Sequence, residues 1–262
     1  MKETAVLPHL TTRWLGHSYH FLETTTSTND VLKKLAADGA AAGTVVATDF
    51  QSQGRGRLGR RWEAAPGTSL MLSLLFRPDW PAERALWLTM IAGLAAAEAI
   101  ESLTPLSISL KWPNDVGLTL ADGWSKLGGL LVEGELDENG RLRQVVVGMG
   151  LNANMMPEQM PEGITPVTSL LAAGGEPVDR QALLLAFLMR MEEWYETAVS
   201  GQSPQPAWQA RLVTLGRSVQ VTQGDRVLMG TAVGVDEWGH LLLRTPSGEQ
   251  HTIGAGDVSL RT

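Results

Sequence analysis

The distribution of apolar residues along the chain predicts a central β-sheet flanked by helices. Five short runs are rich in β-branched or apolar residues and bounded by Gly, Pro or Asp, which is typical of strands; they cover residues 44–49, 69–76, 107–111, 127–134 and 144–151. Three longer runs have helical spacing or a helix-favouring composition; they cover residues 29–38, 82–102 and 180–199. The pattern therefore indicates an α+β domain.

The pattern changes near residue 200. Residues 201–206, Gly-Gln-Ser-Pro-Gln-Pro, predict a loop, and after Leu215 short strand-like runs alternate with turn sequences. The strand-like runs cover residues 218–222, 227–235, 241–244 and 250–253. Such close spacing predicts a small SH3-like β-barrel. We therefore expect two domains, one of residues 1–212 and one of residues 213–262.

Composition narrows the class of protein. With 262 residues, of which 44% are hydrophobic, the chain can form one large core and a small second one. It has no cysteine, which excludes disulfide scaffolds and cysteine nucleophiles. A net charge of −7 disfavours DNA or another polyanion as the main partner. The first 25 residues carry no signal-peptide pattern, and no uninterrupted apolar run reaches the roughly 20 residues of a membrane span. We expect a soluble cytoplasmic protein without a membrane partner.

The most unusual stretch is residues 51–62, Gln-Ser-Gln-Gly-Arg-Gly-Arg-Leu-Gly-Arg-Arg-Trp, directly after a predicted strand. Glycines bring backbone N–H groups close to a ligand, and arginines offer forked cationic donors for phosphate or carboxylate. We interpret it as an anion-binding loop, named here the Arg/Gly loop; a solvated basic loop is the alternative. Its Gly54-x-Gly56-x-x-Gly59 spacing matches a dinucleotide fingerprint, but residues 64–67, Ala-Ala-Pro-Gly, follow where a helix should begin.

A second stretch, Lys111-Trp-Pro-Asn-Asp115, places a cation at a strand end, then a proline-fixed turn, an amide and a carboxylate. Asn114 can present a donor and an acceptor to a base edge or a ribose, and Asp115 can hold a cation or orient an arginine. An ordinary Pro-Asn-Asp turn is an equally good interpretation of this stretch alone.

A third stretch, Lys126-Leu-Gly-Gly-Leu-Leu-Val-Glu133, begins with a lysine at the mouth of an apolar strand, and its two glycines would let a ligand lie against the backbone. Lys126 is the candidate catalytic cation, although a lone strand-end lysine is usually only solvated. Two smaller features are Ser27-Thr28-Asn29 before a helix, which could equally be an N-cap, and Gly148-Met-Gly-Leu-Asn152 at the end of an apolar strand, which could be a packing bend. The five histidines are scattered without metal-ligand spacing.

Taken together and in this order, these five stretches closely resemble the biotin–protein ligase family, from about residue 20 to the C-terminus. The resemblance implies a class II synthetase-like catalytic domain with a central mixed β-sheet and flanking helices, followed by a C-terminal SH3-like β-barrel. It also implies activation of biotin with ATP and transfer to a lysine of a biotin carboxyl carrier protein. Because only about twenty-five residues precede Ser27, we expect no DNA-binding helix-turn-helix and no DNA partner.

The resemblance implies a role for each matching residue. Biotin contacts are implied for Ser27, Thr28, Asn29, Gln51, Gly54, Arg55, Gly56 and Gly129. Contacts with ATP or the adenylate are implied for Arg57, Arg60, Trp62, Lys111, Asn114, Asp115 and Asn152. Catalytic charge stabilisation is implied for Lys126, Lys111 and Arg57. Mg²⁺ would be held through the ATP phosphates, with no protein ligands assigned.

Two departures from the family pattern stand out. The stretch from Gly117 to Ser125 looks like a loop a few residues longer than in some relatives, and Leu58 stands where some relatives carry another arginine. A lipoate ligase or octanoyltransferase would share the fold, and the Arg/Gly loop argues against it. A nucleic-acid-binding protein, whose loop would track phosphates, is a rival of another class. A homodimer formed through a sheet edge is plausible.

Overall fold

A computed structural model describes residues 1–161 and 165–260. Its larger part is built on a seven-stranded sheet in the order β1-β2-β3-β7-β6-β5-β4, in which β1 and β2 are parallel and all other neighbours antiparallel. The strands are β1 (Tyr19–Thr25), β2 (Val45–Gln51), β3 (Ser69–Phe76), β4 (Ser109–Lys111), β5 (Asp115–Leu120), β6 (Gly123–Leu136) and β7 (Leu142–Asn152). The mixed sheet predicted from the sequence is confirmed.

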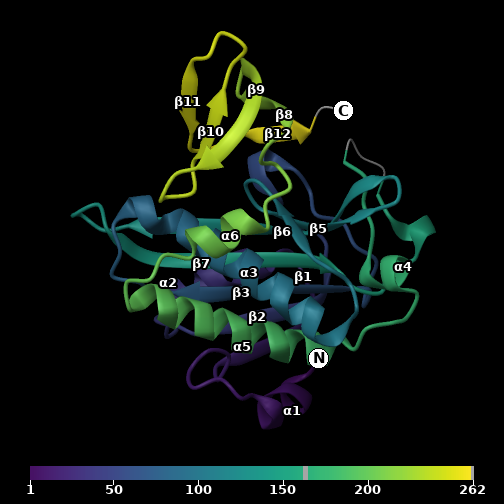
Figure 1. Cartoon of the computed structure of the whole chain (residues 1–262). Helices are drawn as coiled ribbons and strands as arrows, with labels where there is room; N and C mark the ends of the chain where they lie inside the picture. Colours follow the sequence, from purple (N-terminus) through teal and green to yellow (C-terminus); the bar gives the residue numbers. More distant parts are fainter. Residues whose placement is uncertain (162–164, 261–262) are drawn as a thin grey trace.

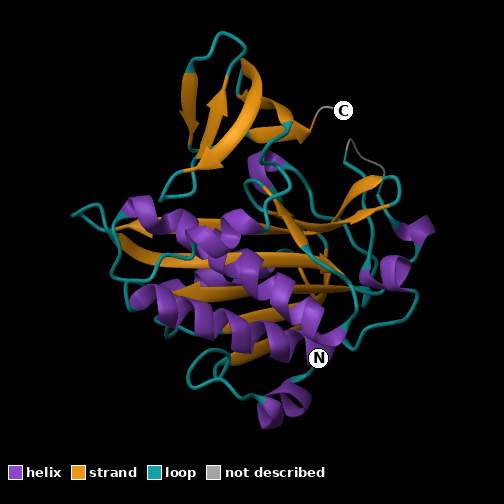
Figure 2. Ribbon diagram, in the orientation of Figure 1, coloured by secondary structure: helices purple, strands orange, loops and turns teal. Residues whose placement is uncertain are grey.

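Helices cover both faces of this sheet. Residues alternate between the faces of a strand: in β2, Val45 and Ala47 belong to the main core, whereas Val46 packs in a second, smaller cluster with Leu32. Helices α3 (Ala85–Leu103) and α5 (Arg180–Val199) lie together across the main-core face (Figure 2), and α2 (Thr28–Ala37) lies on the other. Short helices and turns complete the fold: α1 (Glu3–Val6), α4 (Leu170–Gly174), α6 (Gln205–Ala210), η1 (Leu7–His9), η2 (Arg57–Gly59), η3 (Ala82–Arg84) and η4 (Pro157–Gln159).

Helix α3 is the centre of the core. The segment Ala82–Leu103, with a mean hydropathy of 1.4, is long and apolar enough to cross a membrane, which the sequence pattern alone did not suggest. However, 72% of its most apolar window is buried inside the protein, where α3 packs on α5 and on strands β6 and β7. A helix that is apolar on all sides is expected at such a position, because neighbours surround it.

The C-terminal part is a separate five-stranded antiparallel sheet in the order β11-β10-β9-β8-β12, drawn in yellow in Figure 1 above the central sheet. Its strands are β8 (Ser218–Gln223), β9 (Arg226–Val235), β10 (Leu241–Arg244), β11 (Gln250–Ile253) and β12 (Asp257–Leu260). Its inner residues Val219, Val221 and Leu241 are fully buried and belong to the same hydrophobic cluster as the main core of the central sheet. The predicted SH3-like architecture is confirmed, with β12 as a strand that the sequence pattern did not reveal.

The connection between the two parts is tied to the edge of the central sheet. The Leu110 amide donates to the Arg211 carbonyl, and the Val213 amide donates to the Leu110 carbonyl, so the linker runs beside β4. Trp112 is fully buried at this junction, and its indole Nε1 donates to the Gly239 carbonyl at 2.9 Å, in a turn of the C-terminal sheet. The tryptophan of the Lys-Trp-Pro-Asn-Asp stretch therefore anchors the second domain on the first.

Candidate functional site

A pocket of about 570 Å³ lies between the Arg/Gly loop, the start of α2, strands β4 to β7 and the last strand, β12. The structure brings together in its wall every residue predicted for the site except Gly54: Ser27, Thr28, Asn29, Gln51, Arg55, Gly56, Arg57, Arg60, Trp62, Lys111, Asn114, Asp115, Lys126, Gly129 and Asn152. Gly54 lies behind the wall, where its carbonyl accepts a hydrogen bond from the Trp62 amide. A Cβ at Gly54 would lie 2.4 Å from the Trp62 carbonyl oxygen, so this position closes the base of the loop.

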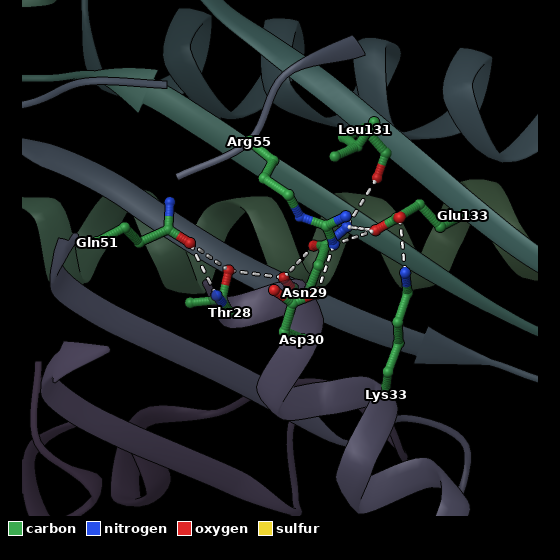
Figure 3. A network of polar contacts seen from close by, with 9 residues as sticks. Thr28, Asn29, Asp30, Lys33, Gln51, Arg55, Leu131 and Glu133 are labelled. Atoms are coloured by element: carbon green, nitrogen blue, oxygen red, sulfur yellow. Dashed lines mark hydrogen bonds and ion pairs between the residues drawn. The ribbon is translucent and has the colours of Figure 1, made fainter. Parts of the chain in front are cut away.

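One end of the pocket is formed by the start of α2. Gln51 accepts hydrogen bonds through Oε1 from both the backbone amide and the hydroxyl of Thr28, at 2.8 and 3.1 Å (Figure 3). Ser73 on β3 donates to Thr28 Oγ1 at 2.7 Å and to Asn29 Oδ1 at 2.5 Å. The Ser27 hydroxyl makes no N-cap bond, although Ser27 stands at the N-cap position. The N-cap alternative therefore does not account for Ser27, whose side chain lines the pocket.

Glu133 on β6 joins this end to the Arg/Gly loop. Its carboxylate accepts hydrogen bonds from Lys33 at 2.6 Å, Asn29 at 2.7 Å and Arg55 at 3.0 Å (Figure 3). Arg55 also pairs with Asp30 of α2 at 2.6 Å. Burial raises the pKa of Glu133, but the bonds from Lys33 and Asn29 outweigh it, so that its pKa lies below the usual value. The first arginine of the loop is thus held by two carboxylates.

The Arg/Gly loop folds back on itself as a tight turn. The Gly56 amide donates to the Arg60 carbonyl at 2.7 Å, and η2 forms the tip. At this tip Leu58 adopts the left-handed conformation, with φ of 55° and ψ of 39°, and its side chain is 68% exposed. Because that conformation costs free energy for a residue with a side chain, the turn places a strained residue at the tip of the loop.

Trp62 ends the loop and lies flat on the sheet. A Cβ at Gly150 of β7 would lie 2.5 Å from the Trp62 ring, so only glycine allows this contact. In the same way, a Cβ at Gly148 would lie 2.2 Å from Asn29 Oδ1. Two glycines of β7 thus form a floor on which two pocket side chains rest. The indole Nε1 of Trp62 is buried without a hydrogen-bond partner among the described residues, which leaves a donor for a ligand.

Two further loop arginines reach other elements. Arg57 donates to Asn114 Oδ1 at 3.2 Å and to the Gly256 carbonyl at 3.4 Å, and Arg60 forms an ion pair with Asp257 of β12. Burial lowers the pKa of Arg57 from its ordinary value, partly offset by Asp257. The loop is therefore closed over the pocket by contacts with the turn after β4 and with the C-terminal sheet.

The other end of the pocket carries two lysines. Lys126 lies within β6, and its Nζ is 2.5 Å from Asp115 Oδ1. Lys111 is buried at the end of β4, and this burial lowers the pKa of its ammonium, while Asp115 raises it and Lys126 lowers it further. Asn114 is fixed beside them, since its Nδ2 donates to the Leu130 carbonyl at 2.6 Å. This end concentrates positive charge around a single shared carboxylate.

Asn152 is placed differently from the other predicted nucleotide contacts. Its amide group donates to the Thr168 carbonyl at 3.1 Å and accepts a bond from Ser69 at 3.4 Å. The side chain is 2% exposed. Asn152 therefore contributes to the wall mainly by ordering the segment that contains Thr168.

No group of three or more His, Asp or Glu side chains that could hold a metal ion occurs among residues 1–161 and 165–260. The two acidic side chains nearest the lysine end, Asp115 and Asp257, each face a cation. The described part of the pocket wall thus offers cationic nitrogens that can face an anion.

The sequence profile of the Biotin/lipoate A/B protein ligase family matches residues 21–152, and that of the biotin protein ligase C-terminal domain matches residues 214–261. The first match spans the α2 start, the Arg/Gly loop and both lysines. The chain belongs to the biotin protein ligase family. Its match to this family extends through both sheets.

Similar proteins agree with this assignment. The chain is 35% identical to the biotin–acetyl-CoA-carboxylase ligase of Mycobacterium tuberculosis, over 89% of this chain and 85% of that protein. It is 32% identical to the bifunctional ligase/repressor BirA of Bacillus subtilis, over 99% of this chain and 79% of that protein. The structure is similar to the biotin protein ligase from Aquifex aeolicus in complex with biotin and ATP, with a TM-score of 0.78, 31% identity, and coverage of 93% of this chain and 98% of that one.

In this member of the biotin protein ligase family, some residues of the pocket could not be predicted from the sequence. Asp257, Val258 and Ser259 come from β12, some two hundred residues after the Arg/Gly loop, and no local pattern links them to it. Glu133 does not line the pocket but contacts Asn29 and Arg55, which do, and it carried a usable signal, because an acidic residue in a largely apolar predicted strand needs a partner. Leu130 and Leu131 also line the pocket and supply apolar surface.

Proposed function

We propose that this chain is a biotin–protein ligase, which converts biotin and ATP to biotinyl-5′-AMP and pyrophosphate and then transfers the biotinyl group to a lysine of a biotin carboxyl carrier protein. The supporting observation is one pocket with two unlike ends. The α2 end offers neutral hydrogen-bonding groups beside Leu131, whose carbonyl accepts from Asn29, and the other end offers Lys111, Lys126 and Arg57.

In the first step, a carboxylate oxygen of biotin attacks the α-phosphorus of ATP, the bond to the bridging oxygen breaks, and pyrophosphate leaves with the electron pair. Both reactants are anionic, so the barrier depends on offsetting their charge. Lys126 and Lys111 would face the carboxylate and the α-phosphate, and Arg57 and Arg60 the remaining phosphates. Mg²⁺ bound to the ATP phosphates would offset further charge.

We assign the α2 end to biotin. Ser27, Thr28 and Gln51 would hold the ureido ring through hydrogen bonds, and Asn29 and Arg55 would support them. Gly56 and Gly129 would lie against the ligand. A small ligand gains most from a few fixed polar groups set in an apolar wall, which is the composition of this end.

We assign Trp62, Asn114 and Asp115 to the nucleotide side, where Trp62 Nε1, which has no partner in the part of the chain that the structure describes, is available to an acceptor. In the second step the carrier lysine attacks the mixed anhydride and AMP leaves with the bonding electron pair. The closed Arg/Gly loop would shield the adenylate from water until then.

We further propose that residues 1–212 are the catalytic unit and residues 213–262 a second unit that completes its pocket through β12. The net charge of −7 supports action on a protein carrier without DNA or membrane, in the cytoplasm where ATP is available. Strand β1 at the sheet edge is a candidate surface for a homodimer.

The experiment that tests this function is pyrophosphate release from Mg·ATP by purified protein without carrier, using biotin, lipoate and octanoate in parallel. A burst near one equivalent with biotin alone is expected, since the adenylate is retained. Release with lipoate or octanoate but not biotin would assign the chain to the lipoate branch of its family. No release by folded protein would overturn the proposal. Addition of a biotin carrier domain should then give its biotinylation at one lysine.

A further inference from the structure

Lys111 is a buried cation without an acidic partner of its own. Among residues 1–161 and 165–260, no hydrogen bond or ion pair involves its ammonium, whereas the neighbouring Lys126 is paired with Asp115. Asp115 and Asp257 favour the charged form of Lys111, but each of them is paired with another cation, Lys126 or Arg60. A buried charge without a counter-charge in direct contact is costly unless something else stabilises it. The pocket therefore needs another source of stabilisation for Lys111.

Trp124 supplies a π-face at this point. The Lys111 ammonium lies 5.5 Å from the centroid of the Trp124 ring, within the range in which an aromatic ring attracts a cation. Trp124 stands two residues before Lys126 on β6, outside the pocket wall, and reaches Lys111 across β5. A carboxylate in its place would cancel the charge of Lys111, but an aromatic ring stabilises the ammonium and leaves its charge available to an anion.

The position of the Trp124 ring is specified by its neighbours. Its indole Nε1 donates to Ser109 Oγ at 3.0 Å, on the same strand as Lys111. On the intervening strand stands Gly117, where a Cβ would lie 2.5 Å from the ring. The β5–β6 register also shifts between Val116 and Gly117, next to this contact. The hydrogen bond to Ser109, the space left by Gly117 and the register shift together fix the orientation of the Trp124 ring.

We propose that Trp124 is a positioning residue for ATP: it holds the unpaired ammonium of Lys111 toward the pocket without neutralising it, so that Lys111 can bind the phosphate groups. This inference rests on the proposed function and adds to it a residue that does not itself contact the substrates. The β5–β6 hairpin that holds Trp124 would accordingly support part of the phosphate site.

The test compares Trp124→Leu and Trp124→Phe with wild type in biotin-dependent pyrophosphate release. Trp124→Leu should lower kcat/KM for Mg·ATP about 3- to 30-fold, the equivalent of one cation–π contact, and leave KM for biotin unchanged. Trp124→Phe, which keeps a π-face, should stay within about 3-fold of wild type. Ser109→Ala should give the same pattern as Trp124→Leu with a smaller loss. Thr119→Ala is the matched control, because exposed Thr119 pairs with Trp124 across the same hairpin.

A double-mutant cycle separates positioning from general support of the hairpin. If Trp124 acts through Lys111, Trp124→Leu should have no further effect in a Lys111→Met background. Two outcomes would overturn this inference and leave the proposed function intact. One is that the losses caused by the two substitutions are fully additive in the double variant; the other is that the wild type is active and Trp124→Leu is equally active. Absence of biotin-dependent release from wild type would overturn the proposed function and this inference with it. Thermal unfolding of each variant checks that the loss does not arise from misfolding.

Discussion

The two ends of the pocket are built on opposite principles. At the α2 end, Thr28 donates to Gln51, Asn29 donates to Glu133, and the nearby cations Lys33 and Arg55 are paired with carboxylates. At the lysine end, Lys111 has no ion-pair partner among the described residues, and Asp115 is paired with Lys126. One end is electrostatically satisfied before any ligand arrives, and the other holds excess positive charge.

The difference matches the chemistry of the proposed substrates. A neutral ring is recognised by hydrogen-bonding groups whose positions are already fixed, because preorganisation lowers the entropy cost of binding. A triphosphate brings its own negative charge, so cations that lack internal partners gain most from its arrival. Variants at the two ends should therefore separate effects on biotin from effects on ATP.

The largest effect is expected at the lysine end, from Lys126→Ala. Loss of a cation that faces the reacting groups should lower the rate of adenylate formation about 10²- to 10³-fold, while biotin affinity changes little. Single-turnover pyrophosphate release and calorimetry of biotin binding measure the two quantities. Exposed Lys34, changed to alanine, is the charge-matched control. Equal losses of biotin affinity and rate would contradict the role given to Lys126.

Arg57→Ala comes next, because Arg57 joins the loop to the turn after β4 and to the C-terminal sheet. Loss of one charge-assisted contact should speed release of biotinyl-5′-AMP about 10- to 100-fold. Dissociation of preformed radiolabelled adenylate measures this rate directly. Arg226→Ala, on an exposed strand end of the C-terminal sheet, controls for charge. An unchanged release rate would show that the loop does not retain the intermediate.

A smaller effect is expected at the α2 end, from Glu133→Gln. The substitution weakens the contacts with Lys33 and Arg55, and we expect KM for biotin to rise about 5- to 10-fold with little change in kcat. Steady-state kinetics at saturating ATP measure the split. Glu135→Gln is the matched control, since Glu135 lies two residues further on β6 and bonds to Gln144, away from the pocket. A fall in kcat with KM unchanged would reverse the assignment of the two ends.

The smallest effect is expected from Asp257→Asn. The Arg60–Asp257 pair links the loop to β12, but its side chains are 66% and 28% exposed, and solvent weakens such pairs. KM for ATP should change by at most about 5-fold at low salt and not at high salt. Kinetics at two salt concentrations test this. A large, salt-independent loss would mean that the C-terminal sheet has a greater role in ATP binding than this pair suggests.

Local sequence patterns predicted much of the fold and of the site. The Arg/Gly loop and the Lys-Trp-Pro-Asn-Asp stretch are recognisable in the sequence by their unusual composition, and the structure brings them to one pocket. Strand β1 was not predicted, because its residues Tyr19–Thr25 are largely polar at an exposed sheet edge. The stretch from Gly117 to Ser125 was expected to be a loop, yet most of it pairs as β5 and β6. The glycines and Asp122 in this stretch favour turns, so the local sequence pattern predicted a loop.

Other features depend on contacts that no local pattern encodes. Asp257 reaches the pocket only because Trp112 and the linker beside β4 fix the second sheet in place. Lys126 was expected at the mouth of a strand, but β6 begins earlier, so Lys126 is an interior residue of that strand. The roles of individual residues remain predictions that the variants above can test.

The glycine floor beneath Asn29 and Trp62 has a consequence for anyone who would redesign this enzyme. Gly148 and Gly150 are required because they lack a Cβ atom. A single methyl group at either position would occupy space that a pocket side chain already fills. Engineering for a larger or smaller substrate therefore has to begin with the residues that stand on the floor. Variants at the two floor glycines themselves would mainly displace Asn29 and Trp62.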